Sequence, residues 1–204
     1  MVSRSQTRPV TQWIESPSGG RERGPTAMAR AWFEAMVRPR RFFRAAVAPA
    51  DQAPGLTFVM VVVGIAVGTR LALVPGASPV YLGSPALSAL FVLAAFVLVV
   101  GPVSLHLAAA FQTVLLILVV RDRAGISETV QTLAYATAPC IFAGVPVPAV
   151  QAAVGVYGTV LLVTGLAVVH ETSPVRAALA GLPVAGAVFG GAFGAAPALS
   201  AVLG

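Results

Sequence analysis

Two uncharged apolar runs, about residues 129–145 and 150–169, are joined only by the short proline-containing turn 145–148. Each run has roughly the 17 to 25 residues that an α-helix needs to cross the hydrocarbon core of a bilayer. Charged residues appear only outside the pair, within 121–128 and from Glu171 onward. The pair therefore predicts a membrane hairpin whose two ends face the same aqueous compartment.

The composition of the whole chain agrees with a membrane protein. Hydrophobic residues make up 57% of it and charged residues only 10%, whereas soluble domains have about 25% charged residues. Segments that span a bilayer must satisfy their backbone hydrogen bonds internally, and the alternating pattern of a β-barrel is absent, so the spans should be α-helical. We predict an all-α integral membrane helical bundle.

The positive charge lies almost entirely in the first quarter of the chain. Residues 1–50 carry nine arginines and three glutamates, whereas residues 51–204 carry four arginines and four acidic residues. Cytoplasmic flanks of membrane proteins are enriched in arginine and lysine, so we expect the N-terminus in the cytoplasm. The basic segment lacks interleaved aromatic residues and any known docking motif for nucleic acid, and we expect no nucleic-acid partner.

Two N-terminal segments precede the first span. Residues 1–25 mix polar residues, glycine and proline without periodicity and predict a disordered cytoplasmic tail. Residues 26–50 predict a basic amphipathic interfacial segment, interrupted by Pro39. Its arginines either lie against anionic lipid headgroups, or fix the topology while Trp32 and Phe43 pack on the bundle. The predicted lipid-facing arginines are Arg38, Arg40, Arg41 and Arg44.

Residues 51–204 predict a five-span membrane domain, with spans near 56–74, 86–120, 129–145, 150–169 and 182–203. Arg70 lies near the outer end of the first span. It is either a charge within the membrane that serves a substrate or ion, or an arginine that extends its side chain to water. A helix over the 35 residues 86–120 would be about 52 Å long, against a core of about 30 Å.

The positive-inside bias decides between one crossing and two for this long stretch. A single crossing places Arg121, Arg123 and Arg176 in the cytoplasm, whereas a double crossing places all three outside. We therefore predict one long second helix, kinked near Gly101-Pro102. Five crossings put the C-terminus on the extracytoplasmic side of the cell membrane.

Few residues could carry chemistry. His106 and His170 have no cluster of acidic residues or cysteines at metal-ligand spacing near them in the sequence, so we expect no catalytic residue, no cofactor and no metal site. Gln131, Tyr135 and Pro139 lie on one face of the third span, and Pro139 frees the carbonyl of Tyr135 from its helical partner. This face is either a polar site for a ligand or partner helix, or a packing kink with local hydrogen bonds.

Glycine is concentrated in the last span. Gly186, Gly190 and Gly194 recur every four residues and predict a face that another helix approaches closely. That helix belongs either to this chain or to a second copy.

Several short motifs resemble the Yip1 domain family in its prokaryotic form. Before the first span, Pro39 and Phe43 belong to an RP..FF element, and in the third span Tyr135 and Pro139 form a YxxxP motif. Pro146 follows the third span, and Gly165 and His170 lie at the end of the fourth. A short loop then leads into an alanine-rich fifth span at Ala177. The resemblance covers about residues 30–204 and implies five spans and a trafficking-type or membrane-shaping role. The DLYGP-like element of the Rab-binding eukaryotic members is absent, so Rab binding is not implied.

Three functional hypotheses follow. The first is a non-enzymatic multi-pass membrane protein that organises membrane or binds a membrane or cytoplasmic protein partner, including a second copy. The second is a small transporter or channel, in which Arg70, His106 and the kinked third span would line one polar path. The third is an intramembrane enzyme, which would require His106 to lie within reach of an acid or of Cys140.

Overall fold

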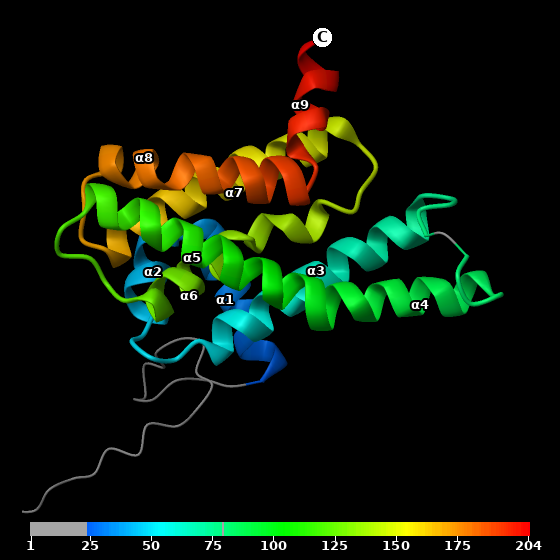
Figure 1. Ribbon diagram of the computed structural model, residues 1–204, viewed down its shortest axis with the longest axis horizontal. Helices are drawn as coiled ribbons and strands as arrows, with labels where there is room; N and C mark the ends of the chain where they lie inside the picture. The colour runs from blue at the N-terminus through cyan, green and yellow to red at the C-terminus, as the bar shows by residue number, and fades with distance from the viewer. Residues whose placement is uncertain (1–23, 79) are drawn as a thin grey trace, which may run out of the picture.

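The computed structural model describes residues 24–78 and 80–204, which form helices and connecting loops, with no strand among them. Proline occupies the first turn of several helices, where its missing amide proton costs no hydrogen bond. The long helices lie side by side in a bundle (Figure 1). The predicted tail 1–25 falls outside the described residues except for its last two positions.

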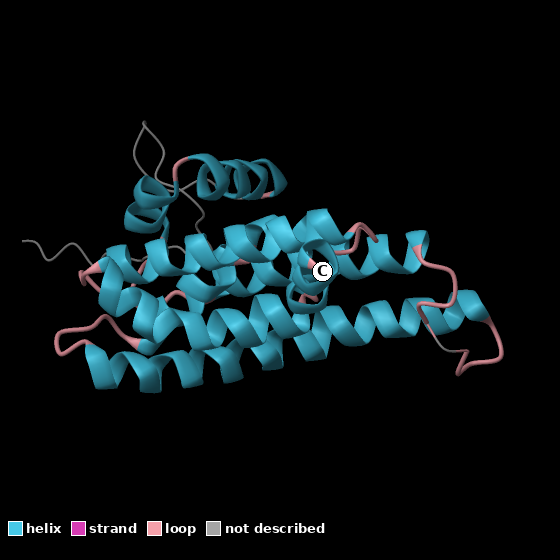
Figure 2. Ribbon diagram, turned by 90° about the horizontal axis from the view of Figure 1, so that it is seen from above, coloured by secondary structure: helices cyan, strands magenta, loops and turns pink. Residues whose placement is uncertain are grey.

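Two N-terminal helices, α1 (Pro25–Val37) and α2 (Pro39–Ala46), lie together on one side of the bundle (Figure 2). As predicted, the first helix is interrupted at Pro39, which begins α2. The buried residues are mainly small in α1 and aromatic in α2: Ala27, Ala31, Ala35, Phe42, Phe43 and Ala46. The N-terminal pair is therefore packed against the bundle by its apolar side.

Four helical stretches of the described residues are long and apolar enough to cross a membrane. They are α3 (Ala53–Leu73), the continuous helix Pro85–Val119, α7 (Pro148–Val169) and the continuous helix Pro174–Ala192. The single helix Pro85–Val119 confirms that residues 86–120 do not fold as a hairpin. It consists of α4 (Pro85–Ala95), η1 (Phe96–Val100) and α5 (Gly101–Val119).

The middle of this long helix is a π-helical turn. The amide of Gly101 donates to the carbonyl of Phe96, five residues back. Pro102, which follows, has no amide proton and a ring that would clash with the preceding turn of an α-helix, so a wider turn accommodates it. The irregularity lies where the sequence predicted a kink.

The predicted third span, 129–145, is not one long helix. It forms α6 (Ile126–Ala136) and a short 3-10 helix, η2 (Ala138–Phe142), and every residue from 129 to 140 is buried. Pro139 cannot donate to the carbonyl of Tyr135, so the α-helix ends beforehand. α6 lies in the middle of the bundle, among the longer helices (Figure 1).

The predicted boundaries of the last span, 182–203, are wrong. Its helix begins with α8 (Pro174–Ala185) because the Ser173 side chain caps the first turn, and it ends with the π-helical segment η3 (Gly186–Ala192). Gly194 then adopts φ +76, a left-handed conformation that glycine tolerates, and α9 (Ala195–Leu203) leaves the direction of the last helix and packs against α7 (Figure 1). Gly194 therefore does not share a helix face with Gly186 and Gly190.

Most of the charged residues after the first span are gathered at one end of the bundle. A cavity there is lined by Arg121 and Asp122 of the α5–α6 loop together with Glu171 and Arg176 beside the α7–α8 loop. Arg40 of α2 lines a neighbouring cavity with Glu171. The N-terminal basic helix and the two charged loops thus lie at the same end.

Candidate functional site

An aromatic cluster joins α2 and α3 to α6. Tyr135 is fully buried, and its ring meets Phe42 at a centroid distance of 4.9 Å and Phe58 at 5.2 Å, both edge to face. Phe42 in turn lies 5.7 Å from Phe43. Such pairs contribute about 0.5–1.5 kcal/mol each beyond the area they bury. The predicted motif tyrosine is therefore the centre of a contact between the N-terminal helices and the bundle.

Phe43 occupies a space that only a glycine leaves free. A Cβ added at Gly165 of α7 would lie 2.9 Å from two ring atoms of Phe43 and 2.8 Å from Cγ2 of Thr132. Real Cβ atoms do not approach heavy atoms so closely. Phe43 and Gly165, separated by more than a hundred residues, are thus two halves of one packing contact.

The same contact carries hydrogen bonds to backbone groups. The side chain of Gln131 accepts from the amide of Ala48 at 3.1 Å and donates to its carbonyl at 2.7 Å. Trp32 Nε1 donates to the carbonyl of Ala138 at 2.8 Å. The hydroxyl of Tyr157 donates to the carbonyl of Met36. Buried backbone groups need such partners, so these bonds hold α1, α2 and the segment before α3 in place.

Two side chains donate to backbone carbonyls next to the break at Pro139. The hydroxyl of Thr137 donates to the carbonyl of Ala134 at 2.6 Å, and Trp32 reaches the adjoining 3-10 helix. Gln131, the other polar residue of this face, is directed to Ala48 rather than to the break. On the predicted polar face, Thr137 therefore bonds to α6, whereas Gln131 bonds to Ala48 in the segment before α3.

His170 lies at the charged end, directly after α7. It is 1% exposed, and its Nε2 lies 3.4 Å from the hydroxyl of Thr129. Burial, together with the positive charge of Arg123, lowers the pKa of His170 to about 4. A charged imidazolium is costly in such a place, so His170 is neutral at physiological pH.

The remaining motif and packing residues lie elsewhere. Ala177 is buried in α8, whereas Pro146 is exposed in the turn before α7. A Cβ at Gly186 would have no heavy atom within 4 Å, and one at Gly190 would meet only Ala196 of the neighbouring α9, at 3.6 Å. The described part of the chain therefore puts no other long helix against this glycine face.

A family model for the Yip1 domain matches residues 33–196, which include every motif residue described above. The chain belongs to the Yip1 domain family. No curated protein and no solved structure gave a match. The family consists of non-enzymatic membrane proteins, and this member is a multi-pass membrane protein.

The polar residues that a transport path would require are only partly brought together in this Yip1-domain protein. Arg70 and Thr137 of the third span line the same cavity, of about 450 Å³, and His106 does not line it. His106 is exposed on α5, where its Nδ1 donates to the carbonyl of Pro102 at 2.8 Å. Cys140 is buried in η2. Within residues 24–78 and 80–204, no group of three His, Cys, Asp or Glu side chains could hold a metal ion.

Sequence reasoning missed the partners of the motif residues. Phe42 and Phe58 complete the aromatic cluster, but nothing in their spacing distinguishes them from other apolar side chains. It also missed the closest backbone approach, at Gly144, where a Cβ would lie 2.0 Å from the carbonyl of Ala66. Only the pairing of α3 with the turn after η2 makes that glycine necessary.

Proposed function

We propose that this Yip1-family protein is a non-enzymatic component of the cell membrane that organises lipids or binds a protein partner through the basic face of α2. The observation that carries the proposal is the division of α2 into two sides. Phe42 and Phe43 are 2% and 1% exposed, whereas the arginines point to the surface: Arg38, Arg40, Arg41 and Arg44. The aromatic side is buried against the bundle, so only the arginine side of α2 is available for binding.

A topology of five crossings underlies this proposal, with the N-terminus in the cytoplasm and the C-terminus outside. Four of the crossings are the long helices, and the fifth is α6 followed by η2. α6 begins at the charged end, where Thr129 lies beside His170, and the chain beyond η2 reaches the far end of α3, where a Cβ at Gly144 would lie 2.9 Å from the amide of Arg70. Irregular backbone is tolerated at membrane depth when protein surrounds it.

Basic side chains at the membrane surface favour anionic lipids by about 1 kcal/mol each. Four arginines on a helix that the bundle holds in place would gather such lipids under α2. The same surface would suit an acidic cytoplasmic protein, and the exposed glycine face of η3 is where a second copy could pack.

The test uses the full chain in vesicles that contain a self-quenching fluorescent phosphatidylglycerol in excess phosphatidylcholine. We expect the protein to increase quenching, the effect to fall at high salt, and replacement of the four arginines by glutamine to remove it. The matched variant with four lysines should keep the effect because it keeps the charge.

Crosslinking in cells through a photoreactive residue at position 41 distinguishes binding of a protein partner from binding of lipids. If quenching is absent but discrete protein adducts form in cells, and these adducts disappear in the four-glutamine variant, α2 serves a protein partner. The proposal is wrong if neither quenching nor adducts depend on the arginines.

A further inference from the structure

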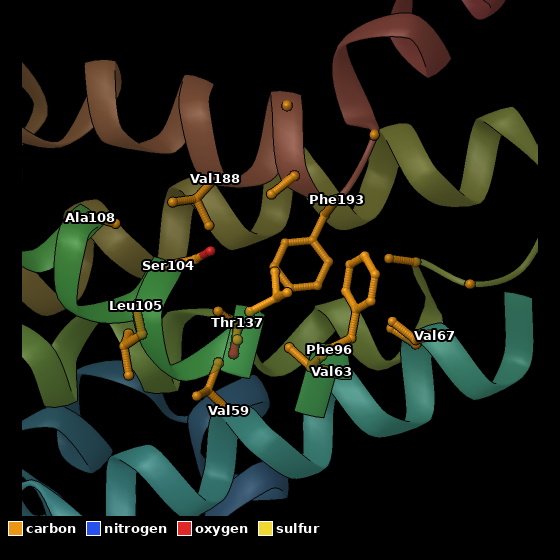
Figure 3. A pocket seen from close by; sticks show the side chains of 18 of the residues that line it. Val59, Val63, Val67, Phe96, Ser104, Leu105, Ala108, Thr137, Val188 and Phe193 are labelled. Carbon is orange, nitrogen blue, oxygen red and sulfur yellow. The ribbon is translucent and has the colours of Figure 1, made fainter. Parts of the chain in front are cut away.

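The cavity of about 450 Å³ lies between five parts of the bundle that are distant in the sequence. Its walls come from α3, from the middle of the long helix Pro85–Val119, from residues between Leu133 and Gly144, from Gln151 of α7, and from the chain between Val188 and Pro197. Phe96 and Phe193 project into it from different elements, and the hydroxyl of Ser104 points toward its interior (Figure 3). Ligand sites in proteins have volumes of about 300–1,000 Å³ and mostly apolar walls.

The irregular helical segments of the bundle meet at this cavity. The π-helical segment η1 contributes Phe96 and Val100, and the π-helical segment η3 contributes Val188 and Gly191. The residue that separates α6 from the 3-10 helix η2, Thr137, lines it as well. π-Helical turns are rare and occur frequently at functional sites. Two of them, distant in sequence, border the same space.

The cavity carries one charge. Arg70 is the only ionisable side chain among the residues that line it, and no acidic residue lies in its wall. Arg70 is exposed and lies in the last turn of α3, which ends at Leu73. An arginine at this position on a spanning helix reaches the headgroup layer while its helix remains in the hydrocarbon core.

The cavity is open along one side to the surface that the bilayer covers. Several wall residues are exposed on both sides of the opening: Phe96, Val100 and Ser104 on the long helix, and Gly191, Ala192 and Pro197 on the other side. The large apolar side chains nearby on the long helix, such as Leu98 and Val99, are exposed as well. A molecule dissolved in the bilayer can therefore enter sideways, without passing through water.

We propose that this cavity binds one anionic phospholipid from the bilayer, with an acyl chain between the two π-helical segments and the phosphate at Arg70. The occupant must be apolar along most of its length, because the wall is, and negatively charged at one end, because Arg70 faces no acid in the wall. An anionic phospholipid has both properties, and its phosphate lies at the depth of the headgroup layer that Arg70 reaches. This site is separate from the basic face of α2, which lies at the other end of the bundle.

The test uses the full chain in vesicles with trace amounts of a phospholipid that carries a photoreactive diazirine in its acyl chain. The lipid has either a phosphatidylglycerol or a phosphatidylcholine headgroup. After irradiation, labelled peptides are identified by mass spectrometry. We expect labelling concentrated in Phe96–Val100, at Ser104 and in 191–197, at least threefold stronger with phosphatidylglycerol.

Two variants fill the cavity from opposite walls, Gly191→Leu and Ser104→Leu. Each should reduce labelling of the wall at least fivefold. Ala187→Leu is the matched control: Ala187 lies on the same π-helical segment, is exposed and does not line the cavity, so labelling should persist. Arg70→Gln should abolish the preference for phosphatidylglycerol and leave the labelling by phosphatidylcholine, whereas Arg176→Gln, outside the cavity, should leave the preference intact.

Labelling spread evenly over the exposed apolar residues of the bundle, including Leu107 and Leu118 at other positions on the long helix, would overturn the proposal. So would equal wall labelling in the native chain and in both filling variants, provided that they unfold at temperatures close to that of the native chain. If wall labelling is specific but does not respond to Arg70→Gln, the cavity takes an acyl chain without choosing its headgroup, and the anionic part of the proposal is wrong.

Discussion

At the scale of single residues, His170 has the clearest consequence for stability. Its folded pKa is about 4, against about 6.5 for an ordinary histidine. The unfolded chain therefore binds a proton between pH 6.5 and pH 4 that the folded chain does not bind, and stability falls as the pH falls through this window. The total loss below pH 4 is on the order of 3 kcal/mol, at about 1.4 kcal/mol per pKa unit.

This effect is measured by thermal unfolding of the detergent-solubilised protein at pH 7.5, 6 and 4.5. Acidification lowers the stability of the native chain for other reasons too, so the difference from His170→Gln isolates the histidine. We expect the native chain to lose on the order of 2 kcal/mol more than the variant between pH 7.5 and pH 4.5. Parallel curves for the two proteins would show that His170 takes up a proton in the folded state as readily as in the unfolded chain.

At the scale of helices, Gln131 links the segment before α3 to α6 through both backbone groups of Ala48. Gln131→Leu leaves these groups without their partner, at a cost of about 1–3 kcal/mol. We expect α2 to open more often, so that trypsin cleaves after Arg40, Arg41 and Arg44 about 5 to 30 times faster. Cleavage at Arg121 in the exposed α5–α6 loop is the internal reference.

The matched control for this prediction is Gln112→Leu. Gln112 is equally buried and donates to the carbonyl of Ala180 at 3.0 Å, so it links α5 to α8. Its replacement should lower stability without accelerating cleavage in α2. If both variants accelerate that cleavage equally, α2 opens only when the whole bundle unfolds, and the local role of Gln131 is wrong.

Helix existence was easier to predict from the sequence than helix ends. Prolines marked the start of α2 at Pro39, and the absence of charge marked the long helix Pro85–Val119. The start of the last helix was missed because Arg176 was taken as lying before the span, although Ser173 and Pro174 are a strong initiation signal. The left-handed turn at Gly194 depends on how α9 packs, which glycine spacing does not reveal.

Some residues of the candidate site could likewise be selected from the sequence, whereas the residues that they contact could not. Gln131 and Tyr135 could be selected because they share a face with Pro139 in an apolar segment, and Phe43 because it belongs to a motif that resembles the Yip1 family. Their partners could not, because a contact such as Phe43 with Gly165 is set by the tertiary packing of α2 on α7. The cavity could not be predicted from the sequence either. It is formed by tertiary packing, and the π-helical turns beside it have no sequence pattern as regular as that of an α-helix.

At the scale of the whole molecule, the proposed five crossings have one alternative, in which α6 and η2 form a re-entrant hairpin. With α6 and η2 as a crossing, the turn at Pro146 lies outside and Glu171 lies in the cytoplasm. With these helices as a loop that enters and leaves on the same side, Pro146 is cytoplasmic and Glu171 outside. The loop at Arg121 is cytoplasmic in both cases, so positions 146 and 171 decide between them.

Single cysteines in a Cys140→Ala background make this measurable, because Cys140 is the only native cysteine. Tyr81, Arg121, Pro146 and Glu171 are all exposed and suit replacement. We expect a membrane-impermeant maleimide to label positions 81 and 146 in intact cells, and positions 121 and 171 only after permeabilisation. Labelling of position 171 in intact cells, with position 146 protected, would leave four crossings and bring the C-terminus back to the cytoplasm. The buried strip from Thr129 to Cys140 would then serve as a plug that enters from the cytoplasmic side, and Arg70 would still mark the outer end of the cavity.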